Sequence, residues 1–203
     1  MNLFVTDDCP HQAAKNLPDK LVVKMALENA QMLAANFSDE FLGFGPLPKK
    51  DGTPYKVTHK NHPCTKWGRE SLPNSMWMVM HGLSICEEYE QRYKKVHASK
   101  AAHLRAFYLL LLNGVPPSAF KDHTPFVRAM PEQYKIADNP IQSYRDYLIN
   151  EKGYAVWKCG NSPDWWDHDT HRPARERYLA EQESKKLARK SNVNQRLQTS
   201  LQN

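Results

Sequence analysis

The stretch Pro18–Asn36, PDKLVVKMALENAQMLAAN, is the part of the sequence that most directly indicates the fold. Proline is tolerated in the first turn of a helix, and an acid such as Asp19 interacts favourably with the positive end of a helix. The residues that follow are good helix formers, and apolar side chains recur among them at helical spacing. We therefore expect a helix over residues 19–36 that buries Leu21, Val22, Met25, Met32 and Leu33.

Further helical patterns follow along the chain. After a loop rich in Gly, Pro and Lys, we expect helices at about residues 69 or 74 to 96, 100–112 and 141–150. Residues 2–5 form a short apolar run that suits an extended segment, and the aromatic stretch 154–166 is expected to pack on the body. The fold class is therefore mainly α, a compact single-domain helical fold with a short N-terminal extended segment and a basic C-terminal helix or tail. We divide the chain into a helical domain, residues 1–168, and a basic tail, residues 169–203.

Charge is distributed unevenly along the 203 residues. The formal net charge is +6, and the segment from residue 172 onward holds eight of the Lys and Arg residues but only three acids. The body is therefore nearly neutral, so recognition of an anion there needs local clusters. No apolar run approaches the ~20 residues of a membrane helix, and no signal peptide is evident. With four scattered cysteines and no CxxC pair, we expect a cytoplasmic protein with free thiols and no membrane partner.

The segment HKNHPCTKWGRE, residues 59–70, concentrates cations and hydrogen-bond donors beside an indole ring. In a first interpretation it contacts DNA: the cations hold phosphates, the imidazoles and the amide donate hydrogen bonds, and Trp67 stacks. In a second it binds a metal through His59, His62 and Cys64, although this spacing is not that of a known zinc site. In a third it is only the loop that enters a helix, with Trp67 in the core.

Several segments together resemble a phage protein family related to the pyrimidine-dimer DNA glycosylases, often called endonuclease V of T-even phages. The similarity covers about residues 1–165, and the segments that carry it are MNLFV (1–5), DKLVVKMALE (19–28), HPCTKW (62–67), EYEQRY (88–93), AMP (129–131) and YR (144–145). Members of the glycosylase family are compact and mostly helical. They excise a damaged pyrimidine and in some cases cleave the strand, and this is the activity that the resemblance implies.

The resemblance also implies which residues carry the chemistry. In the family an essential glutamate lies on the first long helix, about seven residues after a histidine. Glu28 takes the place of this glutamate, whereas Leu21 stands where the histidine would be. The family's nucleophile is an N-terminal amine, exposed when Met1 is removed before a small residue. Because Asn2 is a poor context for that removal, the sequence leaves the lyase step open.

A carboxylate near C1′ stabilises the positive charge that develops on the sugar when an N-glycosidic bond breaks, provided that the base has been turned out of the duplex. Lys24 lies on the face of Glu28 through i, i+4 spacing and would hold a phosphate or act as an amine nucleophile. In the alternative interpretation the two residues form only a surface ion pair. We predict Glu28 and Lys24 as the catalytic residues, and as the DNA-binding residues Lys20, His59, Lys60, Asn61, His62, Lys66, Arg69 and Asn74.

The sequence thus predicts a DNA glycosylase that flips a damaged or modified pyrimidine of double-stranded DNA into a pocket, with no cofactor and no metal. Asp167, His168, Asp169 and His171 are a second metal-binding alternative, although so hydrophilic a stretch suits a solvated spacer. Trp77 and His81 are expected to be a core tryptophan beside a hydrogen-bonded histidine. Two other functions stay open: a transferase that modifies bases in phage DNA, and a non-catalytic DNA-binding protein. The sequence does not indicate an oligomeric state.

Overall fold

The computed structural model describes residues 1–200 of the chain, without the side chains of residues 191 and 193–200. Over this range the secondary structure is helical and contains no strand, only an isolated bridge between Pro48 and Pro54. The predicted mainly α fold is therefore confirmed. The helices are α1 (Pro10–Lys15), α2 (Asp19–Asn36), α3 (Pro63–Glu70), α4 (Leu72–Tyr93), α5 (Lys100–Leu112), α6 (Pro140–Glu151) and α7 (His168–Ser200), with short 3₁₀ turns η1 (Pro117–Asp122) and η2 (Glu132–Tyr134).

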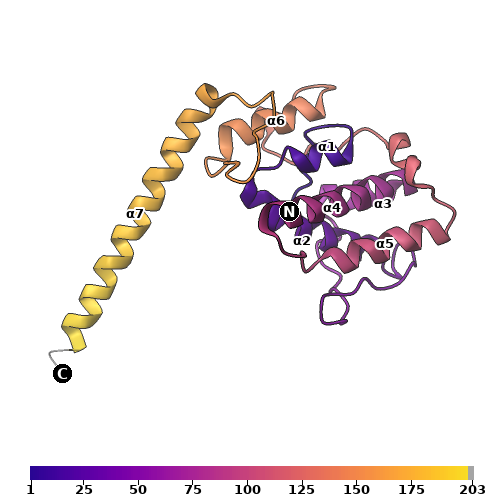
Figure 1. Ribbon diagram of the computed structural model, residues 1–203, viewed down its shortest axis with the longest axis horizontal. Helices are drawn as coiled ribbons and strands as arrows, with labels where there is room; N and C mark the ends of the chain where they lie inside the picture. The colour runs from indigo at the N-terminus through magenta and orange to yellow at the C-terminus, as the bar shows by residue number, and fades with distance from the viewer. Residues whose placement is uncertain (201–203) are drawn as a thin grey trace.

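Helix α2 lies in the core of the body and packs against α3, α4 and α5 (Figure 1). It begins at Asp19, directly after Pro18, as the sequence predicts. All five apolar side chains expected to be buried on it are at most 2% exposed. The predicted helices at 100–112 and 141–150 are also present, as α5 and α6. The core therefore forms around the stretch that the sequence singled out.

The N-terminal segment is extended and enters this core rather than lying on the surface. Leu3, Phe4 and Val5 are all less than 5% exposed. The Asn2 side chain fixes the segment, because its Oδ1 accepts hydrogen bonds from the backbone N–H groups of Leu3 and Phe4. Its Nδ2 donates to the carbonyl of Ala129 at 2.7 Å. The hydrogen bonds of Asn2 to Leu3, Phe4 and Ala129 thus fix where the chain begins in the fold.

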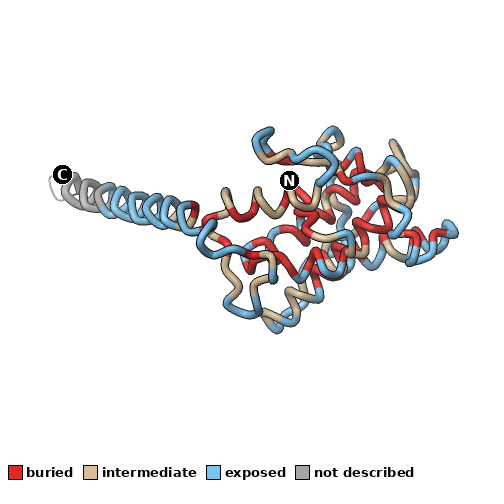
Figure 2. Tube along the Cα trace, turned by 90° about the horizontal axis from the view of Figure 1, so that it is seen from above, coloured by how far each residue is buried: buried red, intermediate tan, exposed pale blue. Residues whose placement is uncertain are grey.

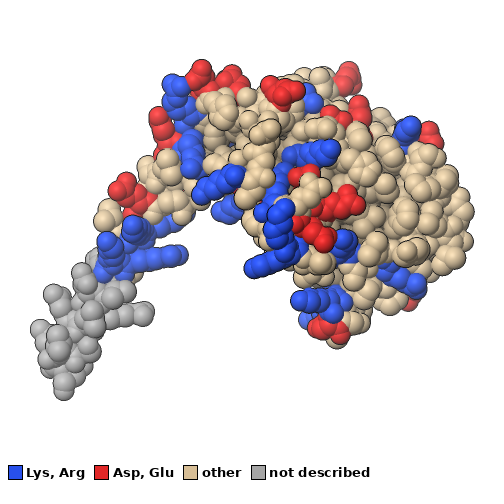
Figure 3. Space-filling view, viewed as in Figure 1, with Lys and Arg blue, Asp and Glu red and all other residues tan. Residues whose placement is uncertain are grey.

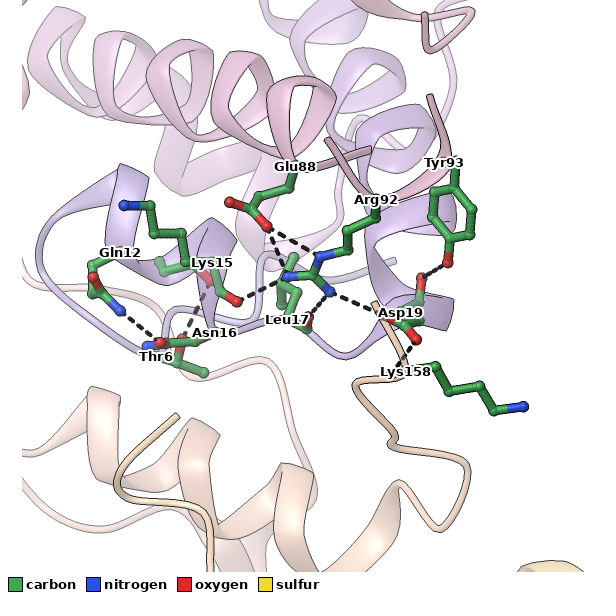
Figure 4. A network of polar contacts seen from close by, with 11 residues as sticks. Thr6, Gln12, Lys15, Asn16, Leu17, Asp19, Glu88, Arg92, Tyr93 and Lys158 are labelled. Atoms are coloured by element: carbon green, nitrogen blue, oxygen red, sulfur yellow. Dashed lines mark hydrogen bonds and ion pairs between the residues drawn. The ribbon is translucent and has the colours of Figure 1, made fainter. Parts of the chain in front are cut away.

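A buried guanidinium connects the first two helices to α4 (Figure 4). The Arg92 side chain is 4% exposed and forms ion pairs with Asp19, at 3.2 Å, and with Glu88, at 2.9 Å. It also donates to the carbonyls of Lys15 and Leu17. Asp19 Oδ2 in turn accepts the backbone N–H of Lys158 at 2.8 Å. The aromatic stretch 154–166 therefore packs back on the body beside the start of α2, as expected.

Helix α7 projects from the body as a long rod (Figure 1). Only its first turns are packed: His171 and Ala174 are buried, whereas the side chains described beyond residue 178 are exposed (Figure 2). The predicted basic tail is therefore a helix over the described part of residues 169–203, and the last three residues lie outside the described range. In the described part of the chain, no helix is long and apolar enough to cross a membrane.

Candidate active site

The carboxylate of Glu28 lies between two amines. Its Oε1 is 3.0 Å from Nζ of Lys24, one turn earlier on α2, and its Oε2 is 3.9 Å from the α-amino nitrogen of Met1. The Glu28 side chain is 12% exposed and the Met1 side chain 6%, whereas Lys24 is 62% exposed. Oε2 has no hydrogen-bond partner among the described residues. Glu28 is therefore a largely buried acid beside an amine, and not a member of a surface pair.

His62 brings an imidazole to the same place. It is the N-cap of α3, and its Nδ1 accepts the backbone N–H of Cys64 at 3.2 Å, so a neutral ring carries its proton on Nε2. Burial lowers the pKa of His62, and the nearby terminal amine lowers it further, while a hydrogen bond to the Met1 backbone and the charge of Glu28 oppose this shift. Pro63 in the first turn fixes where α3 begins. The structure thus places His62 with Met1 and Glu28.

Tyr154 and Tyr178, from the C-terminal half, lie at the edge of this site, and the sequence analysis did not single them out. Burial, together with the charges of Tyr147 and Glu28, raises the pKa of Tyr154 to about 12. Nζ of Lys20 lies 4.7 Å from the centroid of the Tyr154 ring and 5.8 Å from that of Tyr178 on α7. Lys20, one turn before Lys24 on α2, is therefore held over aromatic faces at the edge of the site. The signal in the sequence was the aromatic content of residues 154–166, which predicted packing alone.

The predicted DNA-binding residues of the 59–70 segment divide into exposed and internally bonded ones. His59, Asn61 and Lys66 are exposed. Lys60 forms an ion pair with Glu40. Arg69 donates to the carbonyl of Lys60 at 2.7 Å and lies over a phenyl ring, 3.9 Å from its centroid, so its guanidinium is partly occupied within the protein.

Trp67 and Asn74 belong to the interior. Trp67 is 2% exposed and its indole donates to the carbonyl of Pro125 at 3.0 Å, in agreement with the interpretation that places this ring in the core. The Asn74 amide is fully buried; it donates to the carbonyl of Trp67 and to the hydroxyl of Thr124, and accepts from the Thr124 N–H. Every hydrogen bond of this amide is made within the protein, so Asn74 holds the 59–70 segment in place from the interior.

The expected hydrogen-bonded histidine beside Trp77 is not found. Trp77 is in the core and donates its indole N–H to Asp8. His81 lies against it, with ring centroids 4.8 Å apart, but neither ring nitrogen of His81 has a partner among the residues that the structure describes. The prediction of a satisfied histidine was wrong.

Within residues 1–200, no group of three or more His, Cys, Asp or Glu side chains could hold a metal ion. Neither the 59–64 ligands nor the 167–171 ligands therefore form such a group. A cavity of about 680 Å³ opens between residues 155–162 and the start of α7, and another of about 460 Å³ opens beside α1. Glu28 lines neither of them. Its carboxylate instead pairs with the Met1 amine and with Lys24, and its charge acts on the nearby His62.

The comparison with protein families fits this arrangement. Residues 1–101 match the model of a family described as pyrimidine dimer DNA glycosylase. The chain belongs to this family through its N-terminal half. The match contains Met1, Lys24, Glu28 and His62, whereas Tyr154 and the rest of the C-terminal half lie beyond it. Neither a curated protein nor a solved structure matches the chain. The family described is one of DNA glycosylases, and damaged pyrimidines in DNA are the substrate that its description implies.

Proposed function

We propose that this protein is a DNA glycosylase that excises a damaged or modified pyrimidine from double-stranded DNA. The observation that carries the proposal is the contact between the largely buried Glu28 carboxylate and the Met1 amine, 3.9 Å apart. A fold gains little from this arrangement, because burying a charged carboxylate costs several kcal/mol unless its pairing geometry is excellent. Oε2 of Glu28 is buried and lacks a hydrogen-bond partner in the described part of the chain, so the fold itself makes no hydrogen bond with this acceptor.

The chemistry follows from these groups. Departure of the base leaves positive charge at C1′, and the Glu28 carboxylate stabilises it there. The amine of Met1 loses a proton, to Glu28 or to water, and its lone pair attacks C1′ as the C1′–N bond breaks. The bonding electrons leave with the base, which takes up a proton. In the hydrolytic variant, Glu28 activates a water molecule instead. Either route needs the target nucleotide outside the base stack, and that costs less for a damaged pair.

His62 supplies the imidazole that the family pattern places elsewhere. Leu21, at the family's histidine position, is 1% exposed and lies in the hydrophobic core. His62 approaches the same Glu28 and Met1 from α3, with its proton on Nε2. An imidazole that keeps a lowered pKa is neutral at pH 7 and donates a hydrogen bond without adding charge. In this proposal, His62 therefore orients the amine or the sugar oxygens of the substrate.

Cations around the site hold the phosphates. Lys20 and Lys24 lie on the exposed side of α2, and His59, Asn61 and Lys66 are exposed on the 59–70 segment. Lys and Arg side chains, with acids among them, also line both sides of the angle between the body and α7 (Figure 3). Such contacts position a duplex without reading its sequence. We infer that the strand runs across the N-terminal face of the body, and that the basic helix α7 adds salt-dependent attraction.

The test is base release from duplexes that carry UV photoproducts or modified pyrimidines, analysed by mass spectrometry. We expect Glu28→Gln to slow release at least about 100-fold, because it removes the charge that faces C1′. Glu87→Gln is the matched control, since Glu87 is exposed on α4, and its activity should equal that of the unmodified chain. Unchanged release by Glu28→Gln would remove this assignment. A strand that gains mass without losing a base indicates a transferase, and tight binding without any product indicates a non-catalytic protein.

A borohydride trap identifies the nucleophile. Attack by an amine gives a Schiff base that borohydride fixes to the DNA, and peptide mapping of the trapped complex then locates the bond. We expect it on the Met1 amine, in protein whose intact mass shows that Met1 is present. A bond to Lys24 would transfer the role to that side chain. Base release without a trapped complex would show that water is the nucleophile and that no lyase step follows.

A further inference from the structure

The larger of the two cavities is not lined by Glu28, and aromatic and cationic side chains together form its lining. It measures about 680 Å³, within the range of about 300–1,000 Å³ that small-molecule sites occupy. One side is formed by residues 155–162, and the other by the first turns of α7. Indole rings and cationic side chains face the same space. None of its lining residues is an acid.

The aromatic side of the cavity consists of two tryptophans in edge-to-face contact. The ring centroids of Trp157 and Trp166 are 4.6 Å apart, at an interplanar angle of 66°. Trp166 also contacts His171, at 4.7 Å between centroids. The indole N–H of Trp157 is buried, and the described residues offer it no acceptor. A buried N–H without a partner is uncommon, so a ligand with an acceptor atom would remove a penalty that the protein alone leaves in place.

The cationic side of the cavity comes from α7. Arg172 is 66% exposed and Arg175 is partly buried, where it donates to the carbonyl of Gly153 at 3.1 Å. The acids nearby have other roles. Asp169 pairs with Arg172 at the rim, and Asp167 caps the helix by accepting the N–H groups of residues 169 and 170. An anion in the cavity would therefore meet two guanidinium groups, one of them held in place by the protein.

We propose that this cavity is a nucleotide-binding subsite, in which the base lies against Trp157 and the phosphate pairs with Arg172 and Arg175. Base–indole stacking and guanidinium–phosphate pairing are the two contacts that such a wall supports. The subsite lies next to the candidate active site. The carbonyl of Val156 accepts the N–H of Asp19 at the start of α2, and the charge of Glu28 acts on Tyr154 and raises its pKa. Binding of a nucleotide does not depend on the proposed glycosylase activity. Only the inference that the bound nucleotide belongs to a DNA strand rests on that activity.

Calorimetric titration of the full chain tests the subsite. The probes are thymidine 5′-monophosphate, thymidine, which lacks the phosphate, 2-deoxyribose 5-phosphate, which lacks the base, and a short single-stranded oligothymidylate. We expect the monophosphate to bind at least about tenfold more tightly than either fragment, since it makes both contacts. Trp157→Ala should weaken it about tenfold. Trp165→Ala is the matched control, because this neighbouring indole lines the other cavity.

A second pair of variants tests the phosphate contact and leaves the core untouched. Arg172→Gln should weaken the monophosphate about fivefold and leave thymidine unchanged. Lys185→Gln removes an equally exposed, ion-paired cation farther along α7 and should change neither. The proposal is overturned if the monophosphate does not bind at millimolar concentration, if Trp165→Ala weakens it as much as Trp157→Ala, or if the two charge variants behave alike.

The oligonucleotide distinguishes the two sources of the ligand. If its binding shows the same dependence on Trp157, the subsite takes a nucleotide of a DNA strand. If only the free monophosphate depends on Trp157, the ligand is a free nucleotide, and the subsite still stands. Failure of the proposed function looks different: no base is released from any duplex while the monophosphate still binds. Glu28→Gln should retain the monophosphate affinity of the unmodified chain.

Discussion

Acid should destabilise this protein through two buried histidines on α4 and α5. His81 and His103 are both fully buried. Burial, together with the nearby His103 and His11, lowers the pKa of His81 to about 3. Burial also lowers the pKa of His103 to about 4, although its hydrogen bond to the Ser99 carbonyl opposes the shift. Both rings are therefore neutral in the folded state at pH values where an unfolded chain has already protonated them.

The direction and size of the effect follow from proton linkage. A folded-state pKa below the unfolded value of 6.5 means that the unfolded chain binds more protons, so stability falls as the pH falls. The loss begins near pH 6.5 and continues to about pH 4 for His103 and about pH 3 for His81. At about pH 4.5 each ring has lost about 2–3 kcal/mol, and together they remove about 5 kcal/mol of unfolding free energy. A typical domain has only about 5–15 kcal/mol in all.

Urea unfolding at pH 7 and pH 4.5, followed by circular dichroism, measures this loss. His81→Leu should be nearly neutral at pH 7, because neither of the lost ring nitrogens had a partner in the described part of the chain. Its stability should then fall by about 3 kcal/mol less than that of the unmodified protein between the two pH values. His168→Leu, at an exposed position, should not change the difference. An equal acid loss in His81→Leu and the unmodified chain would refute the reasoning.

Three further substitutions have definite expected outcomes. His62→Asn keeps a good N-cap but removes the imidazole, so base release should slow at least about tenfold and lose its dependence on a group titrating below pH 6.5, while the thermal midpoint is retained. Arg92→Met leaves the buried Asp19 and the half-buried Glu88 without their ion pair and should cost about 3–5 kcal/mol in urea unfolding. Gly82→Ala places a Cβ 2.1 Å from the ring of His103 and should cost about 1–3 kcal/mol, whereas Gly160→Ala, with open space around it, should be neutral in the same assay.

The sequence predicted those elements whose signals are local. Helix α2 has a proline and an acid at its start. Helix α5 ends at Leu112, with Asn113 as its C-cap and Gly114 following at a φ of +75°, a conformation that glycine adopts easily. The helix expected to run from residue 69 or 74 to 96 corresponds to α4, Leu72–Tyr93, and the separate short helix α3, Pro63–Glu70, precedes it. Ser71 caps α4, and Lys94 ends it in a left-handed conformation. A lysine at such a position is uncommon, because its Cβ crowds the backbone, so nothing in the local sequence indicated the end.

The candidate site shows a different limit, since its parts meet through packing. Spacing on one helix predicted that Lys24 and Glu28 share a face, and their 3.0 Å pair confirms it. The approach of Met1 depends on Asn2, whose side chain fixes the extended segment in the core, and the approach of His62 depends on where α3 begins. Neither can be read from a periodic pattern. The resemblance indicated which acid matters, and the tertiary structure supplies the groups around it.

The C-terminal half explains how so neutral a body would hold a polyanion. The family match ends at residue 101, and Tyr154 lies outside it. Its ring nevertheless contacts the cation of Lys20, and the charge of Glu28 raises its pKa. Arg92 and Asp19 fix the backbone of residue 158 to the start of α2, and this holds residues 154–158 beside the N-terminal face. The same segment then leads into α7, where most of the excess positive charge lies. The fold therefore joins a buried acid from one half of the chain to aromatic and cationic surfaces from the other.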